Sequence, residues 1–326
     1  MLVALDEKDR IVNTLELASS DFTDLSDVFL RCPACKSQVR LKHGQIKLPH
    51  FAHVSLDACQ SFSENESVQH LTLKKRLYHW FKADHQKVEV EYFLSELNQT
   101  PDLLVNDRIA IEIQCSPLSV KRLGERTETY RAHGYQVIWL MGRDLWLSDK
   151  MTVLKENLTY FSENAGFYYW ELDLTQACLR LKSMIHQDLT GKIYYHTQTF
   201  DFGTSDLLEI LRSPFQAQRM KKLAVPELKN LPEFIARQLY FQNPKWLKIQ
   251  EKYYVNGENL LLTGEFPVKL APLGLNPLTV KFDGVLVPDF CQIPSEASLI
   301  VNSYYQLFLA KFDGKTVYPP AFYKKI

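Results

Sequence analysis

The chain has 326 residues, of which 46% are hydrophobic and 23% are charged, and its formal net charge is +0. These fractions are those of an ordinary globular protein with two or three modest domains, and they exclude a disordered chain. A zero net charge excludes binding to a polyanion through an overall basic excess, so contacts with nucleic acid would have to use local basic patches.

The first residues indicate where the protein works. The segment MLVALDEKDR becomes charged after five residues and has no apolar core followed by a cleavage site, which argues against a signal peptide. No apolar stretch reaches the roughly 20 residues that span a bilayer, so we expect no membrane insertion. The six cysteines are sparse and unevenly spaced, which favours metal binding or burial over disulfides. We therefore expect a cytoplasmic protein.

The first segment, residues 1–62, contains short strand-like pieces and then a compact group of metal-binding residue types. The members of this group are Cys32, Cys35, His50, His53 and Cys59. A Cys-x-x-Cys turn brings two thiolates within reach of one tetrahedral ion, and the arrangement resembles a zinc ribbon. We predict a small β domain with a structural Zn²⁺; His53 joins the two thiolates, and His50 and Cys59 compete for the last position. The alternative is that these residues merely pack.

The next segment, residues 64–81, has apolar residues at helical spacing. Glu66, His70 and Lys74 fall at i, i+4 and i+8, along one side of the predicted helix. Such a row is either part of a site or a solvated face that is stabilised by i, i+4 pairs.

The alternating and helical patterns that follow predict a mixed α/β core for residues 63–146. Strands are predicted at 87–94, 101–105 and 109–116, a helix at 117–134, and a buried strand at 135–142. With the helix at 64–81, the order is α-β-β-β-α-β.

Acidic residues on the two strands of the predicted hairpin can meet at one end of the sheet. Asp102 enters the first strand, and the period of two places Glu112 beside Gln114 on the second. Converging carboxylates, with Glu66 on the neighbouring helix, form an oxygen-rich site that suits Mg²⁺ or Mn²⁺. We predict that Glu112 and Gln114 face one metal ion.

The remainder, residues 147–326, is rich in leucine and aromatic residues and contains helix-like runs, so we predict a mainly α-helical C-terminal domain. Within FQAQRMKKL, Arg219, Lys221 and Lys222 are candidate DNA contacts, although such a stretch is also typical of an amphipathic helix with snorkelling lysines. Arg126 and Tyr130, at i and i+4 on the second core helix, are further candidates for contact with a phosphate. Simple packing of that helix is the alternative.

Two sets of motifs resemble known families. Pro101-Asp102 followed by Glu112-Ile-Gln114 is similar to the PD-(D/E)XK nuclease signature, with glutamine in the place of the usual lysine. CPAC with PHFAH, ESVQHLTLKKRL, PDLLV, AIEIQCSPLS, Arg126 with Tyr130, and VIWLMG together resemble the competence protein CoiA family of naturally transformable bacteria. The resemblance implies a restriction-endonuclease-like core after a zinc-ribbon-like segment.

The resemblance also implies roles for residues. Asp102 and Glu112 would be metal ligands, Gln114 would stand where the lysine stands, and Glu66 would be the acidic residue of the first core helix. A carboxamide orients water by hydrogen bonds but cannot hold hydroxide electrostatically, so His70 or Lys74 would have to assist.

From the resemblance we expect a metal-dependent DNA nuclease that acts on incoming DNA during natural transformation and recombination. Its partners would be single-stranded or branched DNA and recombination proteins. The main alternative is a DNA-binding recombination mediator that keeps the fold but has lost efficient hydrolysis. A zinc-stabilised scaffold that never touches DNA is a third hypothesis.

Overall fold

The computed structural model describes residues 1–18, 20–25, 28–44, 47–55, 66–217, 222–225, 230–262, 270–273, 289–311 and 316–317. The chain divides into two compact units. The first comprises Met1–Trp146, Trp170–Leu181 and Thr199–Leu211; the second comprises Leu147–Tyr169, Lys182–Gln198 and Arg212–Ile326. Among the described residues, no helix is both long enough and apolar enough to span a membrane.

The first unit begins with a five-stranded sheet in the order β2-β1-β3-β4-β5. Its strands are β1 (Val3–Leu5), β2 (Ile11–Asn13), β3 (Leu30–Arg31), β4 (Gln38–Lys42) and β5 (His50–His53), and a short helix α1 (Asp21–Asp24) lies between β2 and β3. Neighbouring strands are antiparallel. Ala4, Leu30, Val39 and Phe51 form a small buried core with Cys32. This core is small for independent stability, which is consistent with a need for a further cross-link.

The αβββαβ order that the sequence predicts after this sheet is the order that the structure shows. The elements are α2 (Val68–Ala83), β6 (Val88–Val90), β7 (Leu103–Val105), β8 (Ile109–Gln114), α3 (Val120–Ala132) and β9 (Gln136–Met141). Strands β6, β7 and β8 are successively antiparallel, and β9 runs parallel to β8. The fold is therefore mixed α/β.

Local chemistry explains where these elements begin and turn. The hydroxyls of Ser67 and Ser119 cap α2 and α3 by accepting a backbone N–H of the first turn. Asn106 and Asp107 both adopt left-handed φ angles, 49° and 58°, which close the hairpin between β7 and β8. Gly134, with a φ of 78°, follows the end of α3.

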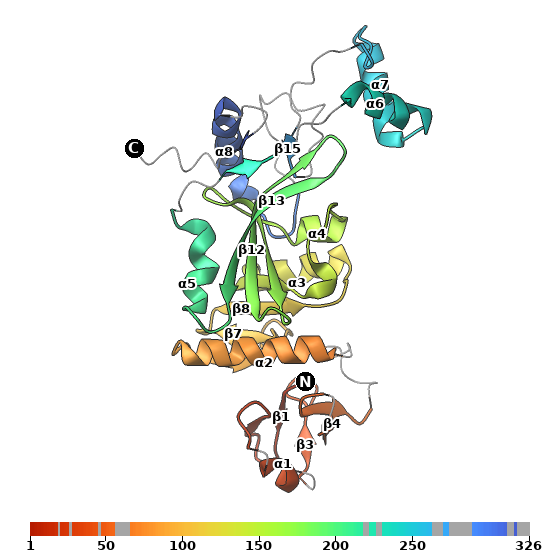
Figure 1. The fold of residues 1–326 in the computed structure, drawn as a ribbon. Helices are drawn as coiled ribbons and strands as arrows, with labels where there is room; N and C mark the ends of the chain where they lie inside the picture. Colours follow the sequence, from red (N-terminus) through yellow and green to blue (C-terminus); the bar gives the residue numbers. More distant parts are fainter. Residues whose placement is uncertain are drawn as a thin grey trace. The chain divides into compact units, whose positions relative to one another are not determined.

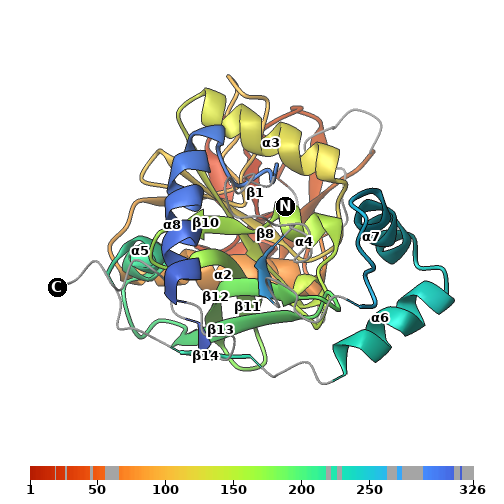
Figure 2. The same cartoon turned by 90° about the horizontal axis from the view of Figure 1, so that it is seen from above.

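The two core helices cover opposite faces of the sheet, with β8 between them (Figure 2). Helix α2 packs against β6, β7 and β8, while α3 packs against β9 (Figure 1). Leu71, Leu77 and Phe81 of α2 are buried because the apolar stripe of the helix faces the sheet. This packing carries the first turn of α2 to the start of β7, where the polar side chains of the candidate site lie.

The prediction of a mainly helical segment after residue 146 is wrong for residues 160–201. These residues form β10 (Tyr160–Ser162), β11 (Gly166–Asp173), β12 (Cys178–Asp188) and β13 (Ile193–Asp201). The sheet continues in the order β13-β12-β11-β9-β8-β7-β6, and β11 lies parallel to β9. Every residue of β11 is buried, so its sequence lacks the alternation that distinguishes a strand from a buried helix.

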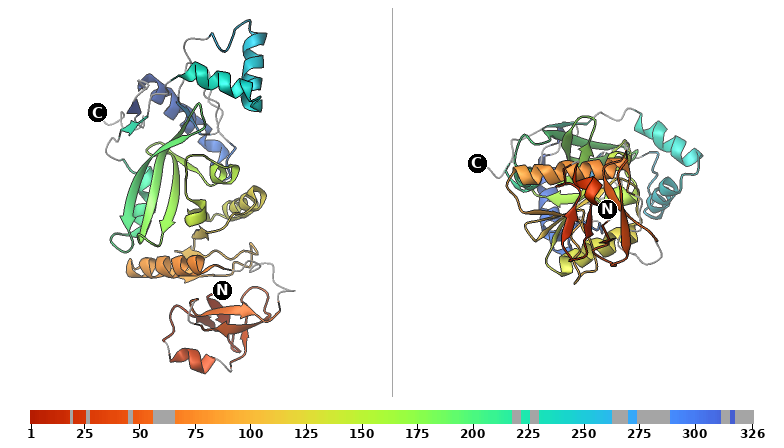
Figure 3. Two further views of the ribbon diagram at one scale, coloured as in Figure 1. Left: turned by 45° about the vertical axis from the view of Figure 1, so that its right-hand side comes forward. Right: turned by 90° about the horizontal axis from the view of Figure 1, so that it is seen from below.

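The remaining elements are mostly short. They are η2 (Arg143–Leu145), α4 (Val153–Asn157), α5 (Leu207–Arg212), η3 (Ser213–Phe215), β14 (Leu223–Ala224), α6 (Leu231–Tyr240), α7 (Pro244–Val255), β15 (Leu270–Pro272), η4 (Ser295–Ala297), α8 (Ser298–Lys311) and β16 (Thr316–Val317). Helices α6 and α7 form an adjacent pair (Figure 3), with Ile235, Trp246 and Ile249 in their shared core. Here the helical prediction agrees with the structure.

Candidate active site

Two carboxylates and an imidazole come together where α2 begins and β7 is entered. The ligand atoms of Glu66, His70 and Asp102 all lie within 4.8 Å of one another. His70 Nε2 lies 3.0 Å from Asp102 Oδ2, and His70 Nδ1 lies 3.4 Å from Glu66 Oε1. The three side chains are only 12–18% exposed. We call these three residues the acidic group; the sequence predicted each of them as a site residue.

The ammonium group of Lys74 lies among these carboxylates and is 1% exposed. Lys74 Nζ donates to Asp102 Oδ1 at 2.9 Å and to Glu91 Oε1 at 2.6 Å, and it also pairs with Glu66. The i, i+4, i+8 row is therefore not a solvated face: His70 and Lys74 lie on one side of α2, and Glu66 precedes the helix.

The charges of these residues stabilise one another. Burial alone would raise the pKa of Glu66, but Lys74, the Met1 amino group and His70 lower it to about 2. For Asp102, His70 and Lys74 likewise outweigh burial and hold the pKa far below its ordinary value. Burial lowers the pKa of Lys74, yet the carboxylates of Asp102, Glu66 and Glu91 raise it well above normal. The lysine is thus cationic and the two carboxylates are anionic.

The acidic group fits a divalent ion in donor type, because carboxylate oxygens suit Mg²⁺ and Mn²⁺ and an imidazole suits transition metals. Backbone bonds fix the position of Asp102: its Oδ2 accepts the N–H of Ile113 at 2.7 Å, and its carbonyl accepts the N–H of Glu91 at 3.1 Å. A bound ion would share its ligands with Lys74.

That Glu112 and Asp102 bind one metal ion stays a prediction. Glu112 is not among the three clustered ligand residues, but it lines the same pocket as Asp102. Its carboxylate accepts the phenol O–H of Tyr130 at 2.7 Å and pairs with Arg126. Burial raises the pKa of Glu112, and Arg126 only partly offsets this effect. Glu112 has these partners because α3 presents Arg126 and Tyr130, four residues apart, to the face of β8 that carries Glu112.

Gln114 also has a local partner, since its side-chain amide donates to the carbonyl of Ser116 at 2.6 Å. That Glu112 and Gln114 face one metal ion stays a prediction. Both residues line a pocket of about 570 Å³ in the first unit. Other residues of its wall include His50, Lys74, Asp102, Arg122 and Arg126.

The predicted DNA contacts have different surroundings. Tyr130 is fully buried and bonds Glu112, as expected if it serves the packing of α3. Arg126 pairs with Glu112 and also lines the pocket. Lys222 is exposed. Arg219 and Lys221 lie outside the described residues.

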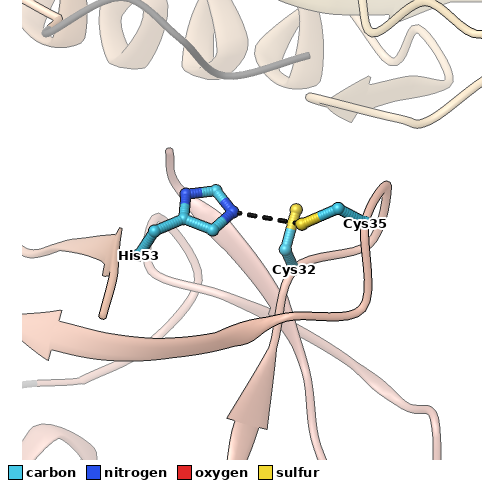
Figure 4. A group of neighbouring side chains, drawn as sticks. All are labelled: Cys32, Cys35 and His53. Carbon is cyan, nitrogen blue, oxygen red and sulfur yellow. Dashed lines mark hydrogen bonds between the residues drawn. The ribbon is translucent and has the colours of Figure 1, made fainter. Parts of the chain in front are cut away.

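A second group of metal-binding residue types lies in the N-terminal sheet. The ligand atoms of Cys32, Cys35 and His53 are within 4.8 Å of one another, and Cys35 Sγ lies 3.4 Å from His53 Nε2 (Figure 4). Burial lowers the pKa of His53, which favours the neutral imidazole that binds metals. We call these three residues the thiolate group. Its donor set suits Zn²⁺, which takes four tetrahedral ligands.

His50 does not lie with the thiolate group as a fourth ligand. Its Nδ1 lies 2.8 Å from the carbonyl oxygen of Leu48, and it is not among the three clustered residues. Cys59, the other candidate, lies outside the described residues.

Glu91 is the site residue that sequence reasoning missed. The alternation of KVEVEYFL places it with Glu89 on one face of a strand. In the structure β6 ends at Val90, and Glu91 adopts a φ of 50° with only 2% exposure. A glutamate at the end of an alternating run is a weak signal, since the period of two predicts the face of a residue only while the strand stays regular.

Comparisons with known proteins identify the family of this chain. Residues 22–62 match the family model "Competence protein CoiA, N-terminal domain", and residues 66–214 match "Competence protein CoiA, nuclease-like domain". The competence protein CoiA of Bacillus subtilis (strain 168) is 33% identical over 114 residues, which cover 34% of this chain and 31% of that protein. The chain thus spans about a third of the length of this curated relative. No solved structure matches the chain. Two adjoining models of one family together with this relative show that the chain belongs to the competence protein CoiA family and has a nuclease-like domain.

Proposed function

We propose that this protein is a metal-dependent deoxyribonuclease that acts on incoming DNA during natural transformation and recombination. The observation that carries the proposal is the acidic group with Lys74 in its midst, inside a pocket of the nuclease-like domain. The reaction is hydrolysis of a phosphodiester, and the DNA is single-stranded or branched. The proposed place of action is the cytoplasm, with recombination proteins as further partners.

Each side chain has a defined part in this proposal. Glu66, His70 and Asp102 hold Mg²⁺ or Mn²⁺, which supplies Lewis-acid polarisation of the phosphate. Lys74 provides the positive charge that Gln114 lacks, because its ammonium lies 2.9 Å from Asp102. Gln114 orients water through its carboxamide. Arg122 and Arg126, on the pocket wall, attract the phosphate backbone.

We also propose that Cys32, Cys35 and His53 hold a structural Zn²⁺ with a fourth ligand. The proximity of their ligand atoms supports this role, as does the small core of the sheet that carries them. In such a site the binding free energy of the metal contributes directly to folding.

The test is an electrophoretic assay with labelled single-stranded, duplex and branched DNA in the presence of Mn²⁺, Mg²⁺ or a chelator. We expect cleavage that requires the metal, and we expect Asp102→Asn to lower it by more than about 100-fold, because even outer-shell partners of a metal cost 10–100-fold. Asp107→Asn is the matched control, since Asp107 is 61% exposed and pairs with Lys87.

The outcomes separate the two functions. Cleavage by Asp102→Asn at the rate of the unmodified protein would refute the site assignment. Binding of DNA without cleavage under any metal would replace the nuclease with the recombination mediator. Asp102→Asn should keep much of its DNA affinity, because removing an anion near the phosphate does not weaken attraction.

A further inference from the structure

The carboxylate of Glu91 connects two parts of the first unit that are far apart in the sequence. Its Oε1 accepts the ammonium of Lys74 at 2.6 Å. Its Oε2 accepts the backbone N–H of Leu2 at 2.6 Å and that of Val3 at 3.4 Å. Leu2 precedes β1 of the N-terminal sheet, and Val3 begins this strand. One buried side chain thus bonds the lysine of the candidate active site to β1, which lies between β2 and β3 in the other sheet.

The backbone at Glu91 departs from the regular strand to make these bonds. Glu89, two residues earlier on β6, is 35% exposed, and Glu91 is 2% exposed. A φ of 50° is uncommon for a residue with a long side chain and persists only where the surroundings hold it. The four bonds to Glu91, including its own N–H to the carbonyl of Asp102, provide that restraint.

The partners of Lys74 show what this restraint does. Of its three carboxylate partners in the described chain, Glu66 and Asp102 belong to the acidic group and Glu91 does not. If a divalent ion took up carboxylate oxygens of the acidic group, Glu91 would still be a partner for the Lys74 ammonium.

We infer that Glu91 is a positioning residue that couples the N-terminal sheet to the candidate active site by holding Lys74 beside the acidic group. The catalytic part of this inference rests on the proposed function; the positioning part does not. The N-terminal sheet is accordingly a component of the site, because the amides of Leu2 and Val3 hold the Glu91 carboxylate that pairs with Lys74. His50, Phe51 and His53 of β5, which line the same pocket, agree with this view.

The experiment measures how fast an amine-acetylating reagent modifies Lys74, read by mass spectrometry in the full-length protein. Lys75, its partly exposed neighbour in α2, is the internal reference. In the unmodified protein Lys74 should react at least about tenfold more slowly than Lys75, because reaction requires local opening. Glu91→Gln should raise the Lys74 rate by about tenfold or more, since a hydrogen bond to a charged group is lost. Glu89→Gln, on the same strand, should leave it unchanged.

Equal Lys74 rates in Glu91→Gln and Glu89→Gln would overturn the inference. If Glu91→Gln does not fold, the comparison is made between Glu91→Asp, whose carboxylate is one methylene shorter, and Glu89→Asp, and equal rates again overturn it. These measurements need no nuclease activity, so they decide the positioning role even if the protein fails to cleave DNA.

Where cleavage is observed, the kinetic constants supply a second readout. Glu91→Gln should lower kcat and leave KM unchanged, because the lysine would act on the reacting phosphate and not on the rest of the strand. A rise in KM alone would overturn the catalytic part, since it would mean that Glu91 serves substrate binding.

Discussion

The acidic group and the thiolate group lie in the same unit but differ in donor chemistry and in charge. Beside one imidazole, the thiolate group offers two soft thiolates, and its sheet has only a small apolar core. Beside one imidazole, the acidic group offers two hard carboxylates, and it already has the Lys74 ammonium as a counter-ion. We propose that a metal stabilises the first arrangement, whereas in the second the Lys74 ammonium already balances the carboxylates.

This difference teaches that clustering of ligand residues does not by itself define the role of a metal. An ion in the thiolate group would cross-link β-strand segments that cannot bury enough apolar surface. An ion in the acidic group would have to share oxygen ligands with a lysine, so its binding would be weaker and adjustable. The following experiments test whether the two groups differ in this way.

The largest effect is expected from Cys32→Ser in the thiolate group. The variant should lose about one zinc per chain and the folding of the N-terminal sheet, because structural zinc contributes about 10–16 kcal/mol in small zinc domains. Metal analysis and circular dichroism measure the two losses. Cys178→Ala, at a buried cysteine outside both groups, is the control. Zinc-free unmodified protein that keeps its N-terminal sheet would rule out the structural role.

The next effect concerns the resident cation of the acidic group. Lys74→Met should lower the free energy of unfolding by about 3–5 kcal/mol in chelator, because buried carboxylates lose their partner. Added Mn²⁺ should restore more stability to this variant than it adds to the unmodified protein, since the ion replaces the ammonium. Urea unfolding measures both, with Lys75→Met as the control. An equal response to Mn²⁺ would contradict competition between lysine and metal.

A smaller effect is expected where the nuclease signature departs from its usual form. Gln114→Lys should change the cleavage rate by no more than about tenfold, upward if water activation limits the rate, because Lys74 already supplies a cation to the site. Lysine can keep the bond to the Ser116 carbonyl, so the fold should not change. Single-turnover cleavage kinetics measure the effect. A much larger gain would show that Lys74 does not substitute for the signature lysine.

The smallest effect is a dependence on pH. The folded-state pKa of Glu66, about 2, lies below its ordinary value of 4.5, so its contribution to stability is complete above pH 4.5 and falls as the pH drops toward 2. Between pH 6 and pH 4 the loss amounts to about 1 kcal/mol. The difference in unfolding free energy between the unmodified protein and Glu66→Gln should shrink by this amount. If this difference in unfolding free energy grew as the pH fell, the pKa of Glu66 would be raised by folding and not lowered.

Local sequence signals determined the αβββαβ order and identified several residues of the candidate site. Serine caps, the Asn106-Asp107 turn and the alternation of β8 act over a few residues, so their effects can be read without the fold. Helical spacing likewise placed His70 and Lys74 on one side of α2, and the C-x-x-C turn pointed to the thiolate group. The zinc itself and the activity stay predictions.

Tertiary structure decided which charged groups meet. Glu112 lies beside Arg126 and Tyr130 because α3 packs over β8, and this packing depends on the whole sheet. Glu91 reaches Lys74 and the amides of Leu2 and Val3 because its backbone leaves the regular strand. The bond to Leu2 also requires the two sheets to lie together, since Leu2 and Glu91 are 89 residues apart in the sequence. Strand β11 was not predicted from the sequence because burial on both faces removes the alternation that marks a strand. Periodicity describes how a segment meets solvent, whereas the partner of a buried charge depends on which distant segment packs against it.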